Sequence, residues 1–147
     1  MRSPISSLPC SFCEIVAGRA PATMVAEDRD VVAFLDLRQF HPGHVLVIPR
    51  AHVADIRSVD DDTAAAVMRM TAHVARAVAQ RFPADGLSVW HSAGAGANQE
   101  VPHLHVHVHP RVVGDGMFQV YPSSPHHPER AQLEAWATEL RTAMAGV

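Results

Sequence analysis

The residues with the clearest chemical potential are four histidines near position 105. His103, His105, His107 and His109 recur at every second position, so a β-strand would carry all four imidazoles on one face. With 11 histidines in 147 residues, three more at these offsets would occur by chance about once in 2,400. Such a row is also a poor choice for stability, because protonated imidazoles repel one another. We therefore expect the histidines to serve a function.

Two chemical roles fit this spacing. Alternate histidines on a strand can bind one metal ion, as the ligand sets of several zinc enzymes do. They can also form a nucleophile with supporting donors around an anion, because a neutral imidazole nitrogen attacks phosphorus well when the opposite nitrogen is fixed as the donor. All 12 basic side chains are arginine, which excludes Schiff-base and P-loop lysine chemistry.

The only two cysteines form a second chemical feature. Cys10 and Cys13 lie three positions apart, and in a chain without secretory features such a pair indicates metal or redox chemistry before a structural disulfide. A redox pair needs a βαβ context, which the order of expected elements does not provide. The alternative is a pair of free, buried thiols without a metal.

Four blocks of sequence resemble the motifs of the histidine triad (HIT) family. Residues 99–108 are similar to its signature, in which three histidines alternate with apolar residues after a glutamine. The other blocks follow in the family order at residues 10–18, 34–36 and 42–52. The resemblance covers roughly residues 10–111 and is highly specific.

The resemblance implies an α+β fold. It has an antiparallel β-sheet of about five strands, one long helix and one C-terminal helix. A single HIT domain would span residues 1–147, with the motif-bearing core at 10–111 and a C-terminal loop and helix at 112–147. Because the family commonly pairs as a two-fold dimer, we expect a homodimer.

The resemblance also implies an activity, that of a nucleotide hydrolase or nucleotidyl transferase. His105 would attack the α-phosphate of a purine nucleotide and form a nucleotidyl-histidine that water hydrolyses. His107 would donate to a phosphate oxygen, His44 would complete the cluster, and Gln99 would contact the phosphate near the leaving group. The substrate is a dinucleoside polyphosphate or a nucleoside phosphoramidate, and the sequence does not choose between them.

A nucleotide pocket is implied by the same resemblance. Its expected residues, besides Gln99, His105 and His107, are Phe12, Ile15, Phe34, Leu35, Asp36, Leu37, Ser92 and Asn98. Asp36 would accept hydrogen bonds from the ribose hydroxyls, whereas Phe34 and Leu37 fit a plain core equally well. Ser92 replaces the usual amide and Asn98 the usual glycine, so we expect rearranged phosphate contacts.

Zinc is the cofactor that the resemblance implies. Cys10, Cys13, His52 and His103 match the family's structural zinc positions, and four protein ligands leave no open position for chemistry. The zinc would therefore be structural. For His109 the sequence leaves two alternatives, a fourth donor at the pocket edge or a surface residue.

Two other functions remain open at this point. The first is a HIT protein that binds nucleotides with little turnover, which the substitutions at Ser92 and Asn98 favour. The second is a metal-dependent hydrolase whose metal is bound by His105 and His107 in the alternating strand.

The first predicted element is a single helical turn at residues 12–18, which Gly18 ends, and strands follow it. Apolar runs predict strands at residues 24–27, 31–36 and 44–48. The last two should form a hairpin through the turn signal Pro42-Gly43.

A long helix should follow and cover one sheet face. Ser58 would cap it, and the acidic residues 60–62 would oppose its dipole, with the helix ending near residue 81. Its apolar stripe consists of Val67, Met70, Val74, Ala77 and Val78.

The remaining elements include the histidine strand at residues 102–110. A strand at 87–91 and a flexible loop at 93–98 precede it, and a surface excursion at 114–128 follows it. Pro128 should lie in the first turn of a final helix. The buried stripe of that helix would be Leu133, Trp136, Ala137 and Leu140.

Composition excludes several classes of function. An apolar fraction of 48% with 18% charged residues predicts a globular protein. The net charge of −3 without a basic cluster predicts neither nucleic-acid nor membrane binding. No signal peptide or membrane span is evident, so we expect a cytoplasmic protein that acts on a small molecule.

Overall fold

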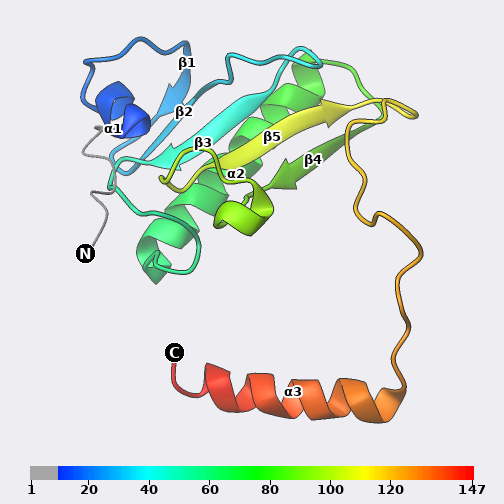
Figure 1. Ribbon diagram of the computed structural model, residues 1–147. Helices are drawn as coiled ribbons and strands as arrows, with labels where there is room; N and C mark the ends of the chain where they lie inside the picture. Colours follow the sequence, from blue (N-terminus) through cyan, green and yellow to red (C-terminus); the bar gives the residue numbers. More distant parts are fainter. Residues whose placement is uncertain (1–9) are drawn as a thin grey trace, which may run out of the picture. The chain divides into compact units, whose positions relative to one another are not determined.

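The structure, a computed structural model, describes residues 10–147 (Figure 1). The chain forms two compact units, one ending at Asp115 and the other comprising Gly116–Val147. The single-domain organisation over residues 1–147 stays a prediction.

An antiparallel five-stranded sheet forms the body of the first unit. Its strands are β1 (Met24–Glu27), β2 (Val31–Leu35), β3 (Val45–Pro49), β4 (Gly86–Trp90) and β5 (Val106–Arg111), in the spatial order β1-β2-β3-β5-β4. The predicted hairpin is present, with Val31 opposite Pro49 and Leu35 opposite Val45. Because β5 pairs with both β3 and β4, its histidines lie inside the sheet rather than at an edge.

Helix α2 (Asp61–Arg81) covers one face of the sheet, as Figure 1 shows. Its buried side chains are Ala66, Val67, Met70, Thr71, Val74 and Val78. They pack against alternate strand residues, which include Val31, Ala33, Val47, Val106 and Val108. Two predictions need correction. Ala77 is exposed, and the helix is capped by Asp60, whose side chain accepts from the backbone N–H of Thr63, rather than by Ser58.

The opposite face of the sheet is covered at one end by the short helix α1 (Ser11–Val16). Phe12 packs there with Val32, Phe34, Leu46 and Ile48. Strands β2 and β3 are therefore buried on both faces in this region, which explains why they appear in the sequence as continuous apolar runs.

The histidine segment is a strand over only part of its predicted length. β5 begins at Val106, and residues 103–105 precede it in an irregular segment, in which the N–H of Leu104 donates to the carbonyl of Val53 at 2.6 Å. Before this segment, a 3-10 turn (Ala95–Ala97) ends at Asn98, whose φ is +60°. Glycine adopts this conformation most readily and asparagine tolerates it, so Asn98 can replace the usual glycine.

The second unit contains helix α3 (Arg130–Met144). Its N-cap is Glu129, so Pro128 precedes the helix instead of lying in its first turn. No residue of α3 is buried. The stripe predicted to be buried is accordingly wrong for this chain, since Trp136 is 46% exposed and Leu140 is 63% exposed. Within residues 10–147, no helix combines the length and apolarity needed to cross a membrane.

Candidate active site

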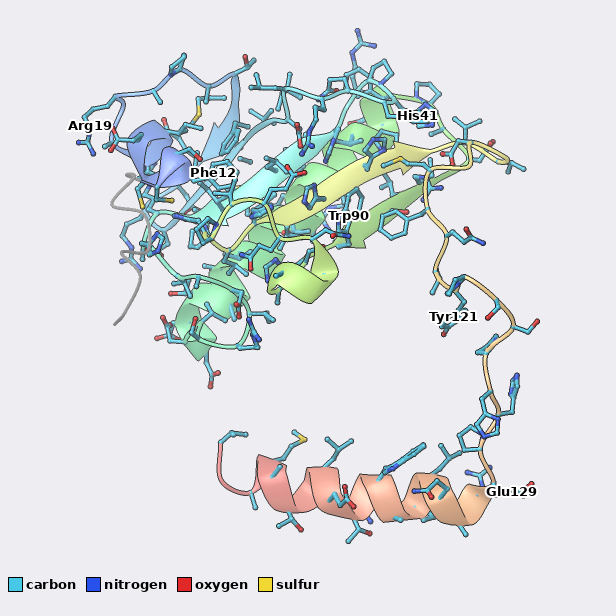
Figure 2. The ribbon with its side chains drawn as sticks, viewed as in Figure 1. Phe12, Arg19, His41, Trp90, Tyr121 and Glu129 are labelled. Atoms are coloured by element: carbon cyan, nitrogen blue, oxygen red, sulfur yellow. The ribbon has the colours of Figure 1, made fainter. Side chains whose placement is uncertain are left out.

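A pocket of about 320 Å³ opens between α1, the end of β2 and the segment that leads into β5. Eight of the residues predicted to bind nucleotide line it, namely Phe12, Ile15, Phe34, Leu35, Asp36, Leu37, His105 and His107. Figure 2 shows Phe12 extending from α1 toward the sheet. Phe34 is at once core and pocket wall, whereas Leu37 is fully exposed and is therefore not a core residue. The volume and the mainly apolar walls are typical of a small-molecule site.

Three predicted residues do not line this pocket. They are Ser92, Asn98 and Gln99. The amide of Gln99 is already engaged, because its Nε2 donates to the carbonyls of Ala54 and Val101 and its Oε1 accepts from the N–H of Gly94. In this structure Gln99 therefore fastens the loop, and its predicted contact with phosphate stays a prediction.

The tautomer of His105 is set by the backbone. Its Nδ1–H donates to the carbonyl of His103 at 2.6 Å, which leaves the lone pair on Nε2. Burial lowers the pKa of His105, so the ring is neutral near pH 7. A neutral imidazole with an unprotonated Nε2 at a pocket wall has the properties of a nucleophile.

His107, which lines the pocket, is hydrogen-bonded to His44. Because the carbonyl of Arg38 accepts from Nδ1–H of His44 at 3.1 Å, the Nε2 of neutral His44 accepts from Nδ1–H of His107 at 2.9 Å. The buried carboxylate of Asp36 lies 3.6 Å from the same His44 nitrogen. Burial, together with the neighbouring imidazoles, lowers the pKa of His107 to about 3, so without ligand its Nε2 is an acceptor.

The two cysteines meet two histidines at one end of the sheet. Sγ of Cys13 lies 3.3 Å from Nδ1 of His52 and 3.6 Å from Nδ1 of His103, and Sγ of Cys10 lies 3.5 Å from the same nitrogen of His103. A tetrahedral zinc ion separates bound sulfur and nitrogen atoms by about 3.5 Å. Nε2–H of His103 donates to the carbonyl of Pro49 at 2.8 Å, so Nδ1 is free to ligate. The donor set thus fits zinc.

Comparison with known proteins identifies the family. Residues 17–113 match the HIT domain. The chain belongs to the HIT family. HIT proteins bind nucleotides, and the family includes hydrolases. One relative is the adenosine 5'-monophosphoramidase hnt1 of Schizosaccharomyces pombe, which is 32% identical over 134 residues, with 90% of this chain and 96% of that protein covered.

Solved structures confirm the α+β fold. A crystal structure from Streptococcus mutans has a TM-score of 0.86 and 35% identity, and the match covers 98% of this chain and 90% of that one. A zinc-bound histidine triad protein from Mycobacterium smegmatis is 36% identical, with a TM-score of 0.70 and coverage of 94% and 99%.

Trp90 is a site residue that the sequence analysis missed. Its ring stacks on the His107 imidazole, with centroids 4.4 Å apart and planes 3° from parallel, and Figure 2 shows it on β4. The signal lies in the strand register, because Trp90 is directly opposite His107. The sequence alone does not predict this register, because it does not reveal that β4 pairs with β5.

Two other histidines of this HIT protein stabilise the site without lining the pocket. Nδ1–H of His91 donates to the carbonyl of His105, and its Nε2 accepts from the N–H of Ile56. His109 is completely buried against His44, so neither a surface position nor a place at the pocket edge describes it. Its Nε2 has no hydrogen-bond partner among the described residues.

Proposed function

We propose that this HIT protein cleaves a purine nucleotide at its α-phosphate through a covalent nucleotidyl-histidine on His105. The observation that carries the proposal is the hydrogen bond from Nδ1–H of His105 to the carbonyl of His103, which leaves Nε2 unprotonated at the pocket wall. The substrate class is a nucleoside phosphoramidate or a dinucleoside polyphosphate. The phosphoramidase activity named for the Schizosaccharomyces pombe relative supports the first of these.

The reaction has two displacements. The Nε2 lone pair of His105 attacks the α-phosphorus, and a P–N bond forms while the bond to the leaving group breaks. The leaving group departs with the bonding electron pair and takes up a proton from solvent. Water then attacks the phosphorus of the nucleotidyl-histidine and gives up one proton to solvent, while the P–N bond to His105 breaks, which releases the mononucleotide and restores the neutral imidazole.

The pocket residues bind the nucleotide in this proposal. Phe12 and Phe34 contact the base, and the buried carboxylate of Asp36 accepts from the ribose hydroxyls. His107 donates to a phosphate oxygen only after its Nε2 gains a proton. The phosphate itself favours this protonation, because a nearby negative charge raises an imidazole pKa.

The test is to trap the intermediate. On incubation with adenosine 5'-phosphoramidate or a diadenosine polyphosphate, the wild type should gain the mass of one adenylyl group on His105, located by peptide mass spectrometry. His105→Asn should lose turnover by about 10³-fold or more while its affinity for AMP changes little. Turnover that persists in His105→Asn contradicts the mechanism. AMP binding without turnover in the wild type favours the binding-protein alternative.

We also propose that Cys10, Cys13, His52 and His103 hold one structural zinc ion, as in the zinc-binding subgroup of the family. The matching distances and the zinc-bound Mycobacterium smegmatis relative support this. Two thiols kept reduced for zinc are consistent with a cytoplasmic location.

One observation favours the metal-dependent alternative. Donor atoms of Asp36, His44 and His107 lie within 4.8 Å of one another. The hydrogen bond that joins His44 to His107 at 2.9 Å accounts for their proximity without a metal. Metal analysis decides between the two, because the proposal requires one zinc per chain and the alternative requires a second ion.

A homodimer completes the proposal. Strand β4 has an open edge, and the exposed apolar side chains Val89 on β4 and Met68 on α2 supply a surface that a second copy can cover. Pairing of two such edges would satisfy the free backbone groups of both strands.

A further inference from the structure

The pocket has an unusual charge balance for a site that binds an anion. Its charged lining residues are Asp36, Arg38 and Glu100. The lining therefore carries one more negative than positive charge.

Among residues 10–147, the single permanently charged cation of the lining, Arg38, is already paired. The guanidinium of Arg38 bonds both carboxylate oxygens of Glu100, at 3.2 Å and 3.0 Å. Nε of Arg38 also lies 3.7 Å from the Asp36 carboxylate. An anionic ligand that approaches Arg38 therefore meets a guanidinium whose positive charge is already balanced by two carboxylates.

The ion pair joins two segments on either side of the pocket. Arg38 follows β2, whereas Glu100 lies five residues before His105 in the segment that leads into β5. Both side chains are well exposed, at 70% and 66%, so the pair contributes little to folding. Because both side chains line the pocket, the pair instead affects which charge a bound ligand can carry.

We propose that Glu100 is a specificity-determining residue that selects the leaving group by its charge. The Glu100 carboxylate pairs with Arg38 and repels an anionic leaving group, whereas it does not repel an uncharged or cationic amine. This inference rests on the proposed function and deepens it. A nucleoside phosphoramidate carries one negative charge at the reacting phosphate, whereas the leaving group of a dinucleoside polyphosphate is a polyanion. In this inference that polyanion leaves the pocket beside the Glu100 carboxylate.

The experiment compares two substrates that share the adenylyl group. Adenosine 5'-phosphoramidate releases ammonia and diadenosine tetraphosphate releases ATP. Glu100→Gln should raise kcat/KM for the polyphosphate about threefold to tenfold, the range expected for removing one charge a few ångströms from another near a protein surface. The value for the phosphoramidate should stay within about twofold, because its leaving group has no negative charge to repel.

Two further variants separate charge from shape. Glu100→Asp keeps the negative charge and should keep the wild-type ratio of the two kcat/KM values. Glu27→Gln is the matched control, because Glu27 also pairs with an arginine, Arg50 at 2.7 Å, but lies outside the pocket. That control should leave both values unchanged. The gain in Glu100→Gln should shrink as sodium chloride rises from about 0.05 M to 0.5 M, because salt screens exposed charges.

Different failures have different meanings. If the wild type turns over both substrates and Glu100→Gln leaves their ratio unchanged, the inference is overturned and the proposed function stands. A change of the same size in Glu27→Gln also overturns it. If the wild type turns over neither substrate, the proposed function fails and the inference falls with it.

Discussion

Backbone carbonyls order the imidazoles of the site. The carbonyls of His103, Arg38 and Pro49 each accept from one ring N–H, on His105, His44 and His103 respectively. Since a neutral imidazole has one donor and one acceptor, each carbonyl also decides which nitrogen keeps a lone pair. In the proposed function, His105 is accordingly the nucleophile and the neighbouring His103 is a zinc ligand.

The buried neutral state of His107 should make stability depend on pH. The pKa is about 3 in the folded protein and about 6.5 in the unfolded chain, so the unfolded state binds more protons between these values. The contribution of His107 to the free energy of unfolding should therefore be complete above pH 6.5. It should decrease on acidification by up to about 1.4 kcal/mol per pH unit. Urea unfolding at pH 7.5 and 5.0 measures the effect.

His107→Gln is the comparison for that measurement. The variant should lose less stability than the wild type between pH 7.5 and 5.0, because it has removed one group that protonates on unfolding. Acid loss of zinc should affect both proteins alike, since His107 does not belong to the proposed zinc ligands, which are Cys10, Cys13, His52 and His103. Equal losses in both proteins contradict the assignment.

Trp90 should act as a positioning residue for His107. Its stacked ring fixes the imidazole plane, and aromatic contacts of this kind contribute about 0.5–1.5 kcal/mol. Trp90→Ala should therefore lower kcat/KM about threefold to tenfold, and Trp90→Phe should restore most of it. If Phe and Ala variants lose activity equally while both remain folded, the stacking has no role in turnover.

At the scale of elements, α1 forms a wall of the pocket without belonging to the sheet. It is only six residues long, too short to be stable by itself in water. Phe12 packs it onto β2 and β3, and the sulfur atoms of Cys10 and Cys13 connect it with His103, next to the histidine strand. A zinc ion there would fix the base wall of the pocket relative to the nucleophile.

Zinc removal should therefore act through folding. A chelator, or Cys13→Ser, should lower the free energy of unfolding by about 3 kcal/mol if zinc is present at a hundredfold its dissociation constant. Activity should fall only as far as the fraction folded, because four protein ligands leave zinc no open position. Metal analysis, circular dichroism and turnover followed in one chelator titration measure all three quantities. Activity lost at constant circular dichroism indicates a metal that takes part in the reaction.

At the scale of the whole molecule, the sheet leaves two edges, β1 and β4. Val25 on β1 and Val89 on β4 are equally exposed, at 46% each, which provides a matched pair of sites. Both lie in the unit that ends at Asp115.

The proposed dimer predicts different results at the two sites. Val89→Arg should give a monomer in sedimentation equilibrium, because two buried arginines would meet across the two-fold axis. Val25→Arg should leave the mass of the wild-type dimer unchanged. A monomeric wild type, or dissociation by Val25→Arg alone, contradicts the proposed interface.

The sequence determined the features that depend on local periodicity. Alternation at His105 and His107, the apolar runs of β2 and β3, and the spacing of α2 were enough to predict these strands and this helix, because strands and helices repeat their side-chain directions every two or 3.6 residues. The α+β fold that joins them was implied by the family resemblance. The family resemblance supplied the pocket and zinc residues, and the structure brings eight of the former and all four of the latter together.

Only the tertiary structure decided which distant residues meet. The stacking of Trp90 on His107 requires β4 beside β5, the pairing of Arg38 with Glu100 requires two loops on either side of one pocket, and the burial of His109 requires strands on both its sides. Gln99 is occupied by backbone groups that no motif reveals. These contacts depend on strand order and loop packing, which join residues far apart in the chain and leave no periodic signal in it.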